Sequence, residues 1–128
     1  MIAGRRAAAV VGIAVGALGL LAACGGSKSS YKPPSGAAVA TLRLDAGNFF
    51  FTPKNPSEPA GIIEIDLKNV SGIQHTLAIS GVKGFELKVN SKGSTDGEKV
   101  DLKTGTYTFY CTIPGHRGQG MQGKLTVK

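Results

Sequence analysis

From Ala38 onward, apolar and polar residues alternate in short runs, and this pattern most limits what the chain can fold into. The runs lie at 39–44, 63–67, 99–103, 106–110 and 124–128. A period of two places one face of a strand in a core and the other face in water, which is typical of antiparallel sheets. No segment keeps the spacing of a helical stripe for more than a few residues. We therefore expect an all-β domain.

Clusters of turn-forming residues separate these runs, at 53–59, 69–72, 81–84, 91–97 and 115–120. Gly, Pro, Asn and Ser favour turns, each for its own conformational reason. About seven to eight short strands at this spacing predict a β-sandwich over 38–128. A domain of this size can bury one modest core. We expect five phenylalanines to help fill it: Phe49, Phe50, Phe51, Phe85 and Phe109.

The segment 1–23 has the features of a secretory signal peptide. Arg5 and Arg6 precede an unbroken apolar run at 7–23, which is the usual order in such signals. The run ends in Leu-Ala-Ala before Cys24, and this ending resembles a bacterial lipobox. The resemblance implies a lipid anchor on Cys24 and a domain on the extracytoplasmic side of the membrane. An uncleaved membrane helix is the alternative, although the run is close to the lower length limit for a span.

The segment 24–37 is rich in Gly, Ser, Lys and Pro and is expected to be a flexible tether. The formal net charge is +7, and +5 remains without Arg5 and Arg6 because thirteen basic and eight acidic residues follow them. This charge favours acidic partners or an anionic membrane surface. The lysines are scattered singly, so the sequence does not favour nucleic acid as a partner.

Four scarce side chains are placed where they can meet. Cys111, His116 and Met121 lie in one loop between two expected strands, and His75 begins another strand upstream. A sandwich brings such strand ends to one pole. Each residue alone would ordinarily be a packing or surface residue, but together they offer one thiolate, two imidazoles and one thioether.

The chemistry of this donor set favours copper. Two imidazoles and a thiolate with a weak thioether form the arrangement of electron-transfer copper sites. Structural zinc takes four strong ligands and catalytic zinc keeps an open position, so the thioether argues against zinc. A Cys–His hydrolase is disfavoured because no acid or amide is placed to support the pair. Pro114 fixes one backbone angle of the loop, and Gly115 allows a turn that other residues resist.

The block Cys-x4-His-x4-Met, with Pro114-Gly115 before His116 and His75 upstream, resembles the cupredoxins, or type 1 blue copper proteins. The loop spacing is similar to that of rusticyanin-like and sulfocyanin-like members, and its Cys-Thr-x-Pro-Gly-His motif resembles that of azurin-like members. The resemblance covers about 38–128 and implies a Greek-key β-sandwich and one copper ion. It also implies one-electron transfer, with partners docking near His116.

One departure from the family pattern concerns the residue after the first histidine. Many members have Asn there, which ties the two ligand loops together, and this chain has Thr76. We expect Thr76 and Thr112 to link the loops by hydrogen bonds, a role that commonly tunes metal sites.

The sequence therefore predicts a monomeric electron carrier rather than an enzyme, with redox proteins as donor and acceptor. Copper storage or delivery without electron traffic is the alternative. Oxidase or nitrite reductase chemistry needs a second copper centre with more histidines, and the chain has only two. A two-copper electron-entry centre needs a second loop cysteine, which the sequence lacks.

Overall fold

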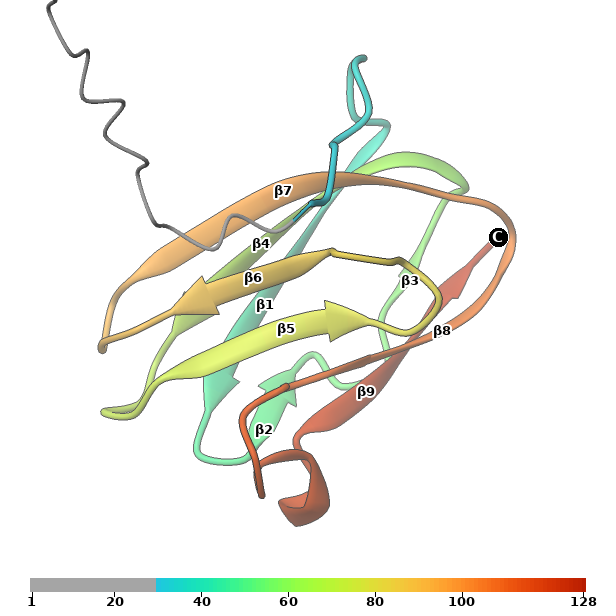
Figure 1. Ribbon diagram of the computed structural model, residues 1–128. Coiled ribbons are helices and arrows are strands. Elements are labelled where there is room, and N and C mark those ends of the chain that lie inside the picture. Colours follow the sequence, from blue (N-terminus) through green and yellow to red (C-terminus); the bar gives the residue numbers. More distant parts are fainter. Residues whose placement is uncertain (1–29) are drawn as a thin grey trace, which may run out of the picture.

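The computed structural model describes residues 30–128 (Figure 1). The predicted signal peptide, Cys24 and the first part of the expected tether lie outside these residues. Within them no helix combines the length and the apolar character needed to span a membrane. The domain boundaries given above remain predictions.

The described chain forms nine strands and one short 3-10 helix, so the all-β prediction is confirmed. The strands are β1 (Ala40–Gly47), β2 (Phe50–Thr52), β3 (Ser57–Glu58), β4 (Gly61–Asn69), β5 (His75–Ile79), β6 (Glu86–Val89), β7 (Thr95–Leu102), β8 (Gly105–Tyr110) and β9 (Gln122–Val127), and the helix η1 covers Arg117–Gln119. The count exceeds the expected seven to eight because β2 and β3 are only three and two residues long. Such short strands leave no alternation to detect.

The strands form two sheets, in the orders β2-β1-β4-β7 and β3-β9-β8-β5-β6, which lie one over the other in Figure 1. Most neighbours are antiparallel, as the alternation suggested. However, β1 pairs with β4 and β3 pairs with β9 in parallel. Parallel neighbours need a crossover connection rather than a hairpin. Between β1 and β4 the chain makes this connection by leaving the first sheet after β2, adding β3 to the second sheet and returning to the first.

The core lies between the sheets and is built from the inward-facing residues of both. Ile63, Ile65 and Leu67 of β4 are buried, and so are Leu77 and Ile79 of β5. Three of the five phenylalanines fill this core as expected: Phe51, Phe85 and Phe109. The other two differ from the expectation, because Phe50 is 47% exposed and Phe49 is only half-buried.

Part of the segment assigned to the tether contacts the domain. The Tyr31 ring meets Phe85 edge-on at 5.2 Å, and its hydroxyl donates to the Lys99 carbonyl at 2.7 Å. The Lys99 ammonium donates to the Gly36 carbonyl at 2.7 Å. An aromatic ring has enough apolar area to pack on a core even in a Ser/Pro-rich segment, so contacts with the domain begin upstream of Ala38.

Candidate metal centre

The pairing of β5 with β8 brings the two predicted ligand segments together. Ala78 pairs with Tyr110 and Ile79 with Phe109 in antiparallel register. Continued toward the start of β5, this register sets Thr76 opposite Thr112. His75 therefore approaches the loop that follows β8, although that loop lies far away in the sequence.

Backbone hydrogen bonds close the loop between β8 and β9. The Cys111 amide donates to the Met121 carbonyl at 3.1 Å, and the Met121 amide donates to the His116 carbonyl at 3.2 Å. Gly115 and Gly120 adopt φ values of 85° and 102°, a left-handed conformation that glycine reaches without steric cost. These contacts hold the thiol, imidazole and thioether of the loop at one end of the sandwich.

Three of the four predicted ligands come together directly. Ligand atoms of His75, Cys111 and His116 all lie within 4.8 Å of one another. The Cys111 sulfur is 3.5 Å from His116 Nδ1, and the two imidazole rings are 5.4 Å apart. Met121 is fully buried in the same core cluster as Cys111. The role of its sulfur as fourth donor stays a prediction.

Burial differs among the four side chains. Cys111, Met121 and His75 are shielded from water, whereas His116 is half-buried. His116 packs edge-on against the ring of Phe49 at 5.1 Å, and Phe49 lies at the margin of the core, partly buried against it. Phe49 adopts a positive φ of 65°, and this turn directs its ring to the loop. His116 is therefore the only one of the four with partial access to the surface.

His75 has one satisfied and one unsatisfied nitrogen. Its Nε2 lies 2.7 Å from the Ser71 hydroxyl, whereas its Nδ1 is buried with no hydrogen-bond partner. Burial, and secondarily the charge of His116, lowers the pKa of His75. The ring is therefore neutral near pH 7 and retains a lone pair, which a metal ligand needs.

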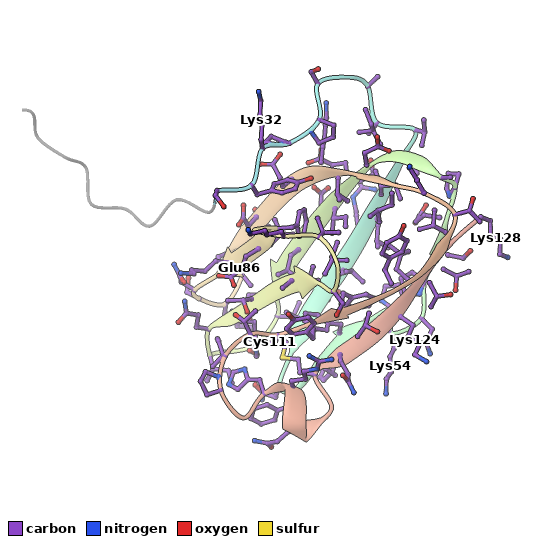
Figure 2. The ribbon with its side chains drawn as sticks, turned by 45° about the vertical axis from the view of Figure 1, so that its right-hand side comes forward. Lys32, Lys54, Glu86, Cys111, Lys124 and Lys128 are labelled. Carbon is purple, nitrogen blue, oxygen red and sulfur yellow. The ribbon has the colours of Figure 1, made fainter. Side chains whose placement is uncertain are left out.

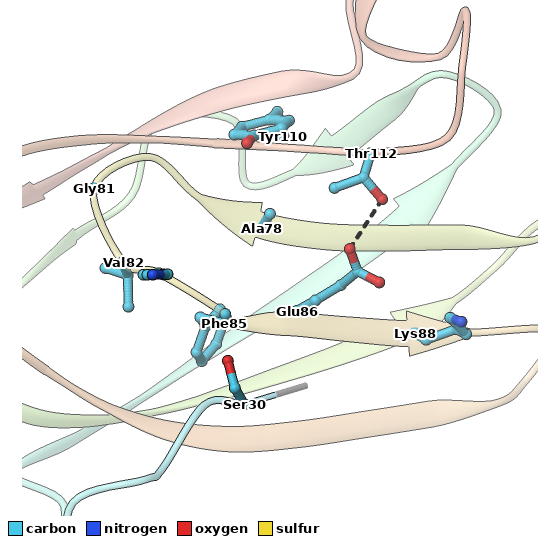
Figure 3. Close-up of a pocket in the computed structure, with 11 residues that line it drawn as sticks. Ser30, Ala78, Gly81, Val82, Phe85, Glu86, Lys88, Tyr110 and Thr112 are labelled. Atoms are coloured by element: carbon cyan, nitrogen blue, oxygen red, sulfur yellow. Dashed lines mark hydrogen bonds between the residues drawn. The ribbon is translucent and has the colours of Figure 1, made fainter. Parts of the chain in front are cut away.

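The hydrogen bonds predicted between Thr76 and Thr112 are present. The Thr112 amide donates to Thr76 Oγ1 at 2.8 Å, and the two Oγ1 atoms lie 2.7 Å apart. Thr112 also donates to a Glu86 carboxylate oxygen at 3.1 Å (Figure 3). The Thr76 amide lies 3.5 Å from the Cys111 sulfur and can donate to it. The backbone beside His75 thus supports the sulfur that the other loop supplies.

A family model for copper binding proteins of the plastocyanin/azurin family matches residues 39–128. The chain belongs to this family. A plastocyanin from Dryopteris crassirhizoma is 35% identical to this cupredoxin over 97 residues, which are 66% of this chain and 93% of the relative. Proteins of this family are in general copper-binding electron carriers that interact with redox partners, and this cupredoxin is one in that general sense.

Solved structures show the same fold. Auracyanin B superposes on this cupredoxin with a TM-score of 0.67 at 21% identity, covering 75% of this chain and 94% of that one. A dithionite-reduced auracyanin from the photosynthetic bacterium Roseiflexus castenholzii gives a TM-score of 0.63 at 23% identity, covering 72% and 99%. The cupredoxin-like sandwich predicted from the sequence is therefore confirmed.

The residues at this end of the cupredoxin fit one copper ion. The buried Nδ1 of His75 lacks any partner in the described chain, and leaving such an atom unpaired costs free energy that coordination would remove. The cluster offers nitrogen and sulfur donors without a carboxylate, a set suited to copper. The cofactor of this cupredoxin is a single copper.

Sequence reasoning missed two buried residues behind His75. Asn69 and Ser71 are 0% and 7% exposed. Asn69 is the last residue of β4, and Ser71 lies in the loop that follows it. The sequence assigned them to a turn, and Asn and Ser are common in turns for local reasons. Nothing in a single sequence separates that ordinary role from the contacts seen here, in which Ser71 reaches His75 and Asn69 reaches Ser71.

Proposed function

We propose that His75, Cys111, His116 and Met121 hold the copper and that this cupredoxin carries single electrons between extracytoplasmic redox partners. His75 and His116 would bind through Nδ1, Cys111 through its thiolate and Met121 through its thioether. The observation that carries the proposal is the buried Nδ1 of His75, left without a partner beside the Cys111–His116 pair. When bound, copper would supply a reversible one-electron couple.

The surface around His116 supports docking at this end of the sandwich. Three of the four large exposed hydrophobic side chains in the described chain lie in segments next to the ligands: Phe50 at 47%, Val70 at 39% and Ile73 at 41% exposure. Phe50 follows Phe49, whose ring packs on His116, and Val70 and Ile73 lie in the loop that leads into His75. In the ligand loop, Ile113 is half-buried and Pro114 is exposed. Apolar contacts of this kind suit brief encounters, and His116, as the partly exposed ligand, would be the exit point for electrons.

A basic groove beside the same loop supports an acidic partner. Lys54, Arg117 and Lys124 line this groove of about 460 Å³, and no acidic residue lines it; Lys54 and Lys124 lie near one another in Figure 2. The Arg117 guanidinium is held 4.1 Å above the Tyr110 ring and donates to Gln122 at 3.0 Å. A cluster of positive charges steers negatively charged partners toward the copper end.

The location of the protein is part of the proposal. The lipobox-like sequence before Cys24 supports a lipid anchor in the cell envelope, on the extracytoplasmic side. A monomer that docks transiently would suit a carrier tethered in this way. Mass spectrometry of the protein purified from membranes tests it: an N-terminal lipid-modified Cys24 supports the anchor, and an intact unmodified N-terminus contradicts it.

Electron transfer is distinguished from copper storage or delivery by cycling the loaded protein. We expect reversible one-electron voltammetry and copper retained after repeated cycles with a copper(I) chelator present. Retention is expected because His75, Cys111 and Met121 are all buried, so the reduced ion has no open exit. Release of copper to the chelator at the first reduction would contradict the carrier and support delivery.

A further inference from the structure

The side-chain amide of Asn69 has one possible orientation. Its Nδ2 lies 2.7 Å from the Ile73 carbonyl and 3.2 Å from the Val89 carbonyl. Its Oδ1 lies 2.8 Å from the Ser71 amide nitrogen. Carbonyls only accept and backbone amides only donate, so exchanging the oxygen and nitrogen of this amide would break all three contacts. Asn69 is fully buried, and no water can compensate for a broken one.

The Ser71 hydroxyl has two acceptors besides His75: the fixed Asn69 oxygen and, at the longer distance of 3.4 Å, the Ile73 carbonyl. Ser71 Oγ is 3.1 Å from Asn69 Oδ1, which can only accept, and 2.7 Å from His75 Nε2. A hydroxyl has one proton and two lone pairs. If the proton goes to Asn69, Ser71 accepts from an Nε2–H of His75 and every contact is satisfied.

The opposite assignment leaves two faults. If Ser71 donated its proton to His75 Nε2, the Ser71 and Asn69 oxygens would face each other at 3.1 Å without a proton between them. The neutral His75 ring would then carry its proton on Nδ1, a buried atom with no acceptor in the described chain. Unsatisfied buried polar groups cost roughly 1–3 kcal/mol each, so the hydrogen-bond network selects the first assignment.

We propose that Asn69, acting through Ser71, holds His75 as the tautomer protonated on Nε2 and so leaves Nδ1 bare before copper arrives. Asn69 and Ser71 are positioning residues, and the inference rests on the proposed role of His75 as a ligand. A ligand ring that already has the correct tautomer and orientation binds metal without rearranging, and outer hydrogen bonds of this kind commonly raise metal affinity.

Ser71→Ala removes the acceptor of Nε2–H while leaving the His75 side chain itself intact. Each tautomer of the ring then has one buried N–H without a partner, so the preference for Nε2–H is lost. We expect a mixture of tautomers in the metal-free variant. Its copper affinity should fall roughly 10- to 100-fold, the usual range for loss of an outer-shell partner.

The test is the imidazole nitrogen NMR spectrum of the metal-free protein at about pH 8, where the ring is neutral, together with copper competition titrations. We expect wild-type His75 to show a protonated Nε2 and a bare Nδ1. Ser71→Ala should show averaged signals and weaker copper binding. Ser71→Thr, which keeps the hydroxyl, should restore both, and Ser80→Ala, an exposed serine at the other end of β5, should match the wild type.

Two results would overturn the inference. One is a wild-type His75 protonated on Nδ1, which decides the matter even if Ser71→Ala fails to fold. The other is a folded Ser71→Ala protein with an unchanged tautomer and unchanged copper affinity. Either result leaves the proposed copper site intact as long as the wild type still binds copper. Failure of the wild type to bind copper would count against the proposed function instead.

Discussion

The Thr112 amide donates to the hydroxyl oxygen of Thr76 at 2.8 Å, and the two hydroxyl oxygens lie 2.7 Å apart. This contact joins the strand that begins with His75 to the loop that begins with Cys111. Since Thr112 donates its own hydroxyl proton to Glu86, the Thr76 hydroxyl donates to Thr112. The two ligand segments are therefore connected in both directions.

Replacing Thr76 with Val should loosen this connection. The Thr112 amide and hydroxyl would both lose a partner, and we expect a loss of about 1–3 kcal/mol in the free energy of unfolding. Copper should also be removed faster by a chelator. Denaturant unfolding and chelator kinetics measure the two effects. The control is Thr106→Val, an exposed threonine on β8, and a Thr76→Val protein as stable as this control would contradict the link.

Met121 should tune the reduction potential rather than make copper binding possible. Met121→Leu conserves volume and should cost less than about 1.5 kcal/mol of stability. It removes a donor from the oxidised ion, so the potential should rise. Met121→Gln offers an oxygen donor that favours copper(II), so the potential should fall, because such sites are tuned through this ligand. If voltammetry gave both variants the same reduction potential as the wild type, the sulfur would not approach the metal.

The buried His75 ring should make the stability of the metal-free protein depend on pH. Its pKa is lowered in the folded state but is about 6.5 in an unfolded chain. Between these two values the unfolded state binds the extra proton, so stability rises with pH. The stabilisation is complete above about pH 6.5 and decreases below it, by at most ~1.4 kcal/mol per pH unit, until the folded-state pKa is passed.

Urea unfolding of the metal-free protein from about pH 7.5 to 5.5 measures this dependence. We expect His75→Gln to flatten the profile relative to the wild type, since it removes the group whose pKa changes on folding. His116→Gln, which replaces the half-buried ring, should keep most of the slope. A His75→Gln profile as steep as that of the wild type would assign the pH dependence to other groups.

The basic groove should affect reaction rates through charge. Lys54→Glu combined with Lys124→Glu reverses two of its three cations, and we expect roughly tenfold slower reduction by hexacyanoferrate(II) at low salt. The control, Lys68→Glu with Lys103→Glu, has the same net charge but changes residues outside the groove. The difference should vanish near 1 M salt, where the Debye length is about 3 Å. Equal slowing by both double variants would show that only net charge matters.

The sequence predicted the fold class and the ligand loop because both depend on local patterns. Alternation located β1, β4, β7, β8 and β9, and scarcity singled out the thiol, the imidazoles and the thioether. The sequence could not show that β1 and β4 run parallel, because a period of two is the same for either direction. It also could not place Phe49 against His116. Three consecutive phenylalanines are ordinarily predicted to be buried, and only the turn geometry shows that the first of them faces the ligand loop.

The network behind His75 was beyond the sequence for a different reason. Asn69 reaches the carbonyl of Val89, which is near only because β5 pairs with β6 and sets His75 opposite Val89. A contact that depends on strand register is visible only after folding. The Thr76–Thr112 contact could be predicted because the family pattern already placed those two positions together.

The most direct test of the account is a titration of the metal-free protein with copper(II), followed by its visible spectrum. The account predicts that one equivalent produces an intense blue or green charge-transfer band, which is lost in Cys111→Ser because the band needs a copper–thiolate bond. Saturation at one ion should coincide with the full band. Binding without such a band, or an equal band in Cys111→Ser, would contradict the assignment of Cys111 and its neighbours as the copper ligands.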